Sequence, residues 1–203
     1  MKRFFASAGI VSIALAGSAA CAFAATSATA TANLNVRSGP GPQYAASGVI
    51  RNGDEVTVDG CIQNSQWCRV SYDGGQGWAY ARYLTATYEN RTVVIEDERD
   101  ALGVPQVTYE APADAPNPTI DGELIGRVDD TDSFPPPPDT VRTYVVDNRR
   151  DPVYLDGEVV VGAGIPDTVD LAPVPDSDYD YAYVNDQPVV VDPDSRRIVY
   201  VYR

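Results

Sequence analysis

The chain has 203 residues, a formal net charge of −14, no histidine and one lysine, Lys2. Without histidine the chain cannot build a Ser-His-Asp or Cys-His catalytic site or a His-ligated zinc site. Its single lysine is the second residue of the chain, so a P-loop is excluded as well. The acidic excess lies in residues 89–203, and such a surface repels nucleic acid because phosphate binding needs cations.

The first 24 residues have the pattern of a secretory signal peptide. Lys2 and Arg3 precede an apolar run over residues 4–16, and a small-x-small cleavage site ends at Ala24. That run is too short to span a bilayer, and no later segment is apolar enough to do so. We therefore expect the mature chain to be periplasmic or secreted and to have no transmembrane segment.

Cys21 leaves an alternative open, since a cysteine after three small residues is similar to a lipoprotein cleavage site. Ser18 occupies the position three residues before it, where leucine is usual. The simpler interpretation is that Cys21 is removed with the signal peptide.

Residues 25–32 are rich in alanine and threonine, and we expect them to form a flexible lead-in. Residues 33–86 alternate between apolar and polar side chains, as half-buried strands do. Adjacent glycines after Asp73 indicate a tight hairpin turn, because glycine adopts positive φ without strain. The pattern predicts a small β-barrel that includes Leu34–Val36, Val56–Val58, Trp67–Tyr72, Gly77–Tyr80 and a helical turn over Ala81–Leu84.

Cys61 and Cys68 are the two cysteines after the expected signal peptide, and six residues separate them. This spacing lets them face each other across a hairpin and is too long for a CxxC redox site. We expect a disulfide, which stabilises the folded state by about 2–3 kcal/mol on the chain-entropy model. A reactive dithiol is the alternative.

The same region resembles the bacterial SH3 domain family in the order and spacing of four segments. These are the opening Asn35-Val36-Arg37-Ser38-Gly39-Pro40, the strand Asp54–Cys61, the strand Trp67–Val70 and the ending Gly77–Leu84. The resemblance implies an SH3-like barrel. Many members recognise cell-wall peptides or glycans, and others pack against a neighbouring catalytic domain. Because this sequence shows no such domain after the barrel, the resemblance favours targeting or scaffolding.

Aromatic side chains of the barrel are candidate ligand contacts, because their faces stack on sugar rings and peptide planes. An arginine beside them can pair with a peptide carboxylate. We expect Tyr44 and Arg82 to be exposed, whereas Trp78 and Tyr83 have a second interpretation as core residues. The candidate site comprises Tyr44, Trp67, Trp78, Tyr80, Arg82 and Tyr83.

Residues 87–140 are acidic and rich in proline, including the run Pro135–Pro138. Proline lacks a backbone donor and favours polyproline II, so we expect a semi-rigid linker. Thr92–Ile95 is its one strand-like piece. A eukaryotic-type SH3 groove is an alternative partner for the proline run, although that recognition is intracellular.

Residues 141–203 predict an antiparallel β unit of two hairpins with an internal repeat. Tyr144–Asp147 and Val189–Asp192 are each followed by an arginine pair and a second apolar run. The segments Gly162–Pro175, Tyr183–Asn185 and Val189–Tyr202 resemble an uncharacterised domain of exported proteobacterial proteins. That family has no established activity, so the resemblance supports architecture and compartment only.

Together these features predict a mainly β, exported, non-enzymatic protein whose SH3-like barrel engages peptidoglycan or an envelope protein. A periplasmic interaction scaffold that does not bind the wall is the second hypothesis. A third is calcium binding by the carboxylates of Asp129–Asp132 or Asp176–Asp180, although neither run matches an EF-hand loop. A carboxylate pair that hydrolyses a glycosidic bond is chemically conceivable, but nothing marks one. We expect no catalytic residue, cofactor, metal or nucleic-acid partner.

Overall fold

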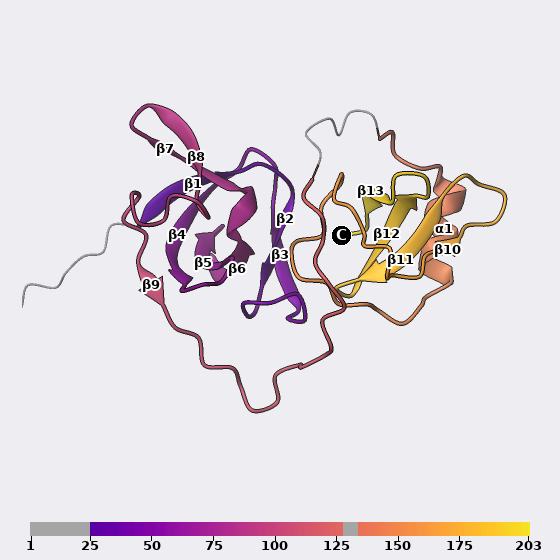
Figure 1. Ribbon diagram of the computed structural model, residues 1–203, viewed down its shortest axis with the longest axis horizontal. Coiled ribbons are helices and arrows are strands. Elements are labelled where there is room, and N and C mark those ends of the chain that lie inside the picture. Colours follow the sequence, from indigo (N-terminus) through magenta and orange to yellow (C-terminus); the bar gives the residue numbers. More distant parts are fainter. Residues whose placement is uncertain (1–24, 128–133) are drawn as a thin grey trace, which may run out of the picture.

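The computed structural model describes residues 25–127 and 134–203 and contains two β units (Figure 1). A nine-stranded sheet forms the N-terminal unit and a four-stranded sheet forms the C-terminal unit. Pairing is antiparallel except for β9, so the predicted mainly β fold class is confirmed. The expected signal peptide with Cys21 and the acidic run Asp129–Asp132 lie outside the described residues.

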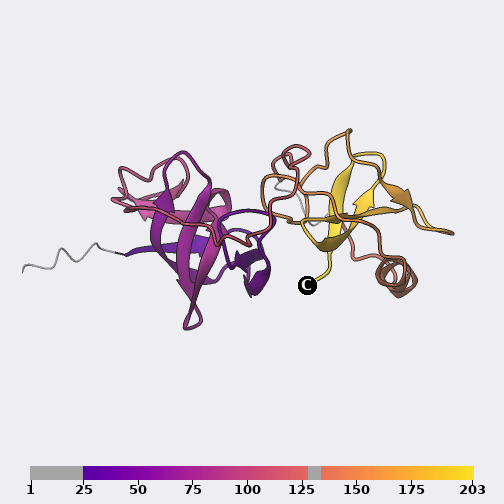
Figure 2. The same cartoon turned by 90° about the horizontal axis from the view of Figure 1, so that it is seen from below.

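The N-terminal sheet curls into a barrel around an apolar core (Figures 1 and 2). Its strand order is β3-β2-β6-β5-β4-β1-β7-β8, and β9 adds to β4. In β4, Val56 and Val58 are buried and Glu55 is exposed, as the predicted alternation requires. The elements are β1 (Thr26–Ala30), β2 (Leu34–Arg37), β3 (Ala46–Ile50), β4 (Glu55–Ile62), β5 (Trp67–Tyr72), β6 (Gly75–Tyr80), the 3-10 helix η1 (Ala81–Tyr83), β7 (Leu84–Tyr88), β8 (Arg91–Val94) and β9 (Gln106–Val107).

The hairpin between β5 and β6 confirms the predicted tight turn. Tyr72 pairs with Gly75, and Asp73 and Gly74 between them have φ values of 49° and 75°. A two-residue turn with positive φ at both central positions matches the twist of the flanking strands. The helical turn expected after β6 is also confirmed, because η1 follows directly.

Cys61 and Cys68 form the predicted disulfide. Cys61 lies in β4 and Cys68 in β5, and the two residues are direct partners across this antiparallel pair. Cys61 also pairs with Gln106 of β9 on its other side. The disulfide therefore braces β4 at the place where a segment from outside the expected barrel joins the sheet.

The lead-in over residues 25–32 is not flexible, so that expectation is wrong. Most of it forms β1, which pairs with β4 and β7. Ala28 and Ala30 are buried at 2% and 1% exposure, because small side chains at alternate positions fit inside the barrel. The backbone partners of β1 are far away in sequence, and local composition does not reveal them.

The expected linker over residues 87–140 is more structured than its composition predicts. The strand-like piece Thr92–Ile95 is confirmed, because β8 pairs with β7 through a turn at Glu89 and Asn90. Further along, β9 joins the barrel, and isolated bridges tie Glu123 and Ile125 to the C-terminal unit. Several backbone groups of this segment thus pair with one unit or the other, so these parts form a strap rather than a free spacer.

The C-terminal sheet has the order β10-β11-β12-β13 and carries one α-helix, α1 (Figure 1). The second expected repeat is confirmed, because β12 and β13 form the predicted hairpin after Val189. The turn between β11 and β12 contains Asn185 and Asp186 at φ values of 52° and 64°. The elements are α1 (Asp139–Asp147), β10 (Ala172–Pro173), β11 (Asp180–Val184), β12 (Gln187–Asp192) and β13 (Arg197–Val201).

The first expected repeat is not a strand, because Tyr144–Asp147 lies within α1. Val141 and Val145 are four residues apart and both buried, so they share the face of the helix that packs on the sheet. Pro138 immediately precedes the helix, where a missing backbone donor is tolerated best. Over only four residues, this segment fits both the period of an α-helix and the period of a β-strand. Its packing against the sheet favours the helix.

A continuous apolar core joins the two units. It extends from the barrel residues Leu34 and Tyr80 through Leu155 and Val159 to Val191 on the sheet face opposite α1. The C-terminal unit therefore packs directly on the barrel.

Candidate functional site

The structure gathers the six predicted site residues around β5, β6, η1 and the β2–β3 loop. Trp67 and Tyr80 pack edge to face with ring centroids 5.5 Å apart, and Tyr80 and Tyr83 lie 6.2 Å apart. Tyr44 and Trp78 are linked through a third ring, Tyr109, which the sequence did not suggest.

Five of the six predicted residues are buried. The exposed fractions are 9% for Tyr44, 4% for Trp67, 6% for Trp78, 2% for Tyr80 and 8% for Tyr83. The expectation that Tyr44 is exposed is wrong, and the expectation for Arg82 is confirmed, since 45% of its side chain is exposed. The core interpretation of Trp78 and Tyr83 agrees with their burial. We call these five rings of the barrel the aromatic surface. Other parts of the chain cover this surface, which is why the rings are buried.

Tyr109 covers the first part of the aromatic surface, formed by Tyr44 and Trp78. Its ring centroid lies 5.7 Å from that of Tyr44 and 5.4 Å from that of Trp78, and both contacts are edge to face. Edge-to-face packing is one of the two favoured geometries for aromatic pairs. Gly39 makes room for Tyr44, because a Cβ atom there would lie 2.5 Å from the Tyr44 ring.

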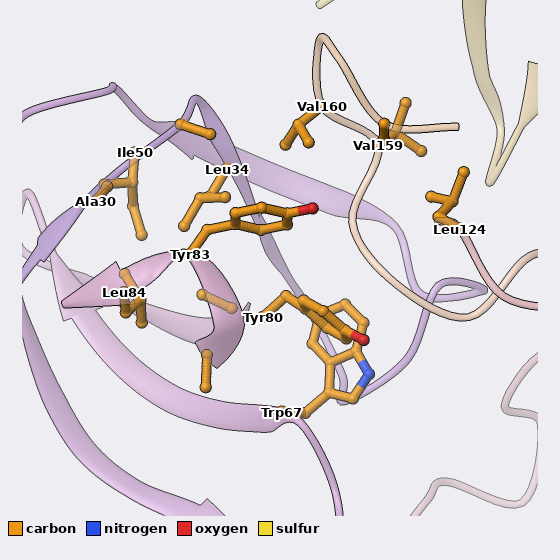
Figure 3. Close-up of a cluster of buried hydrophobic side chains, with 14 of the residues drawn as sticks. Ala30, Leu34, Ile50, Trp67, Tyr80, Tyr83, Leu84, Leu124, Val159 and Val160 are labelled. Carbon is orange, nitrogen blue, oxygen red and sulfur yellow. The ribbon is translucent and has the colours of Figure 1, made fainter. Parts of the chain in front are cut away.

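The C-terminal unit and the segment leading to it cover the second part, formed by Trp67, Tyr80 and Tyr83. Figure 3 shows Tyr80 and Tyr83 pointing toward Leu124, Val159 and Val160, which are at most 5% exposed. Burial raises the pKa of the Tyr80 hydroxyl far above its usual value, so the hydroxyl stays neutral.

A buried polar cluster stands beside these apolar contacts. Glu158 of the C-terminal unit has a fully buried side chain, and Asn35 of β2 donates its side-chain amide and its backbone N–H, at 3.4 Å, to Glu158 Oε1. Asn35 also exchanges two hydrogen bonds with Gln187, at 2.9 Å and 3.2 Å. The amide of Asn35 therefore connects the barrel to two separate points of the C-terminal unit.

Two arginines neutralise this cluster. Arg37 Nε lies 3.8 Å from Glu158 Oε2, and Arg37 Nη1 donates to the carbonyls of Pro42 and Tyr44 at 2.9 Å and 2.7 Å. Arg203 Nη2 donates to Asn33 O of the barrel at 2.8 Å and to Val159 O at 2.7 Å. Burial raises the pKa of Glu158, and attraction by the two arginines opposes that shift.

Sequence reasoning assigned no role to this polar cluster or to Tyr109. Asn35 and Arg37 belong to the family-like opening, and both are buried because β2 has protein on both faces. The signal available in the sequence was an asparagine and an arginine on either side of Val36 in a predicted strand. Only the partner Glu158, 123 residues away from Asn35, explains it.

Among residues 25–127 and 134–203, no group of three or more His, Cys, Asp or Glu side chains is arranged to hold a metal ion. The candidate calcium run Asp176–Asp180 lies at the turn between β10 and β11. Ser177 closes that turn by donating to Val174 O at 2.9 Å. No helix in the described part of the chain is long and apolar enough to cross a membrane.

Two segments of the chain match known families. Residues 32–85 match the bacterial SH3 domain family. Residues 144–203 match a family described as a domain of unknown function, DUF1236. Comparison with curated proteins finds no match to this chain. The two family matches confirm both suspected resemblances, and the first indicates that the barrel is a binding module.

Proposed function

We propose that this chain is an exported, non-enzymatic binding protein whose SH3-like barrel engages a component of the cell envelope, either peptidoglycan or an envelope protein. The observation that carries the proposal is the disulfide-braced barrel that matches the bacterial SH3 domain family over residues 32–85. Arg82, whose side chain is 45% exposed at the edge of the covered aromatic rings, can pair with a carboxylate of a peptide ligand.

Two independent features support export. Residues 1–24 have the charge, the apolar run and the small residues of a secretory signal peptide. The Cys61–Cys68 disulfide suits the periplasm or the cell exterior, because cytosolic thiol systems keep cysteines reduced.

The chemistry of the aromatic surface supports binding without catalysis. The sequence contains no histidine, and the predicted site holds five aromatic residues and Arg82. The carboxylate that faces Arg37 belongs to Glu158, which is 1% exposed and has no access to a substrate. Arg82, the exposed member of the predicted site, can pair with a ligand but supplies no nucleophile and base for bond cleavage.

One observation favours a protein partner over a glycan. The barrel already holds an extended polypeptide in this structure, since β9 pairs with β4 and Tyr109 packs between Tyr44 and Trp78. A scaffold that binds envelope proteins is therefore the second candidate function.

Co-sedimentation of residues 25–203 with protein-free peptidoglycan sacculi tests the proposal. Saturable pelleting supports a wall ligand. If the chain stays in solution, cross-linking in intact cells, followed by identification of the linked envelope protein, tests the second candidate. Failure of both experiments overturns the proposal.

Arg82 provides a site-directed version of this test. Its side chain is 45% exposed and its ion pair with Glu123, at 3.7 Å, is also exposed, so its loss should change the free energy of unfolding by less than about 0.5 kcal/mol. We predict that Arg82→Ala weakens binding to sacculi, whereas the exposed control Arg91→Ala on β8 does not. Equal binding by both variants and the wild type would remove Arg82 from the site.

A further inference from the structure

Residues 105–109 lie on the barrel as an extended segment with a strict alternation. Pro105, Val107 and Tyr109 are half-buried against the barrel, whereas Gln106 and Thr108 are exposed. The backbone pairs in parallel with β4, where Gln106 lies beside Cys61 and Val107 beside Ile62. This is the geometry of a peptide added to a sheet edge, with main-chain pairing on one side and alternate side chains on the surface.

Gly60 lets this segment approach β4 closely. A Cβ atom at Gly60 would lie 2.5 Å from Val107 Cγ1 and 2.8 Å from Pro105 O. The next residue, Cys61, donates its backbone N–H to Pro105 O at 2.9 Å. The absence of a side chain at Gly60 thus creates the space in which a second backbone fits against the strand.

The far end of the segment is held by its aromatic side chain. Tyr109 inserts between Tyr44 and Trp78, with ring centroids 5.7 Å and 5.4 Å away. Together, the edge of β4 over Gly60–Ile62 and these two rings form a surface that we call the strap groove. It accepts an apolar residue followed, two positions later, by an aromatic one.

The segment is held by few interactions. The regular pairing comprises only the two residues of β9, and the chain from Glu110 to Asp114 is exposed on leaving the groove. Local segments with few buried contacts open at a small fraction of the free energy needed for global unfolding. In Figure 1 the chain leaves β9 as a long loop along the lower edge of the molecule, which gives the segment room to withdraw without moving either β unit.

We propose that the strap groove is a peptide-binding site that the chain fills with its own residues 105–109, and that the partner is an extended polypeptide with the same alternation of apolar residues ending in an aromatic one. This inference rests on the proposed function and names the chemistry of its protein partner. The tethered segment competes with the partner at a local concentration of about millimolar, so it lowers the partner's apparent affinity.

Binding of a labelled synthetic peptide of residues 103–112 to the 25–203 chain tests the proposal. In the variant Val107→Ser/Tyr109→Ser the internal occupant is weakened, and we expect the peptide to bind about tenfold or more tightly than it binds the wild type. The matched control Gln106→Ser/Thr108→Ser changes the exposed side of the same segment and should bind like the wild type. A peptide carrying the Tyr109→Ala change should lose the gain in affinity.

Equal binding of the peptide to both double variants, or no binding to the Val107→Ser/Tyr109→Ser chain while its thermal unfolding remains cooperative, overturns the proposal. If that chain does not fold, displacement is measured in the wild type instead. Excess peptide should then increase hydrogen exchange at the paired Val107 amide, and unchanged exchange there at saturating peptide overturns the proposal. Neither measurement uses sacculi, so failure of the strap groove is distinguishable from failure of the envelope-binding function.

Discussion

At the scale of single residues, Glu158 lies fully buried between the barrel and the C-terminal unit. Asn35 donates to its Oε1, while Arg37 and Arg203 are the charged groups that face it. Burial raises the pKa of Glu158 above its ordinary value, because the ionised form loses its hydration there. The folded chain therefore binds the proton of Glu158 more tightly than the unfolded chain.

We predict that the wild type loses thermal stability relative to Glu158→Gln as the pH rises from below about 4 to 7. Because Glu158 has a higher pKa in the folded chain than in the unfolded chain, its protonation stabilises the folded state. This stabilisation is complete at a pH below the pKa of the unfolded chain, and it is lost as the pH rises through the pKa of the folded chain. Glutamine has no proton to titrate at this position. Melting temperatures of both proteins over that pH range measure the effect, and a pH-independent difference between them would contradict it.

Asn35 joins the two units through the same cluster, so its removal has a large cost. We predict that Asn35→Ala lowers the free energy of unfolding by about 3 kcal/mol, since Glu158 and Gln187 lose their buried partner. Urea unfolding measures this loss. The exposed control Asn52→Ala should change the same quantity by less than about 0.5 kcal/mol, and similar losses in both variants would argue against the cluster.

At the scale of elements, the disulfide and β9 depend on the same stretch of β4. Cys61 is bonded to Cys68 on one side, and its backbone N–H donates to Pro105 O on the other. Replacing both cysteines by alanine should lower the free energy of unfolding by about 2–3 kcal/mol. The same replacement should also increase hydrogen exchange at the backbone amide of residue 61. An exchange rate unchanged from that of the oxidised wild type would show that β9 is independent of the disulfide.

The elements predicted correctly from sequence are those whose determining partners are close along the chain. The β5–β6 hairpin follows from Asp73 and Gly74, and the β12–β13 hairpin from two apolar runs joined by a polar turn. Helix α1 was missed because the three apolar and aromatic residues Tyr144–Val146 fit both the period of a helix and that of a strand. Strand β9 was missed although Pro105, Val107 and Tyr109 alternate with polar residues, because the surrounding prolines indicated a spacer.

At the scale of the whole molecule, the barrel and the C-terminal unit share one core, so they should not behave as independent domains. Trp67 and Trp78 are the only tryptophans in the sequence, and both lie on the aromatic surface at 4% and 6% exposure. Removal of residues 96–203 takes away Tyr109, Leu124 and Val159, which cover this surface.

We predict that the fragment 25–95 melts at a lower temperature than the 25–203 chain and self-associates with increasing concentration, because it exposes aromatic rings. Its tryptophan emission should shift to longer wavelength as water reaches Trp67 and Trp78. Differential scanning fluorimetry, analytical ultracentrifugation and emission spectra measure these effects. A monomeric fragment with the emission maximum of the full 25–203 chain would contradict the prediction.

Sequence patterns predicted the mainly β class, the Cys61–Cys68 disulfide, the barrel with its resemblance to bacterial SH3 domains and the exposure of Arg82. Each of these depends on local alternation, turn residues or the family-like spacing of short segments. The tertiary structure alone decided that the aromatic surface is covered, since Tyr109 and Val159 reach it from other parts of the chain. It also decided that β1 is a strand and that Asn35 meets Glu158, because backbone pairing and buried polar partners form between residues distant in sequence.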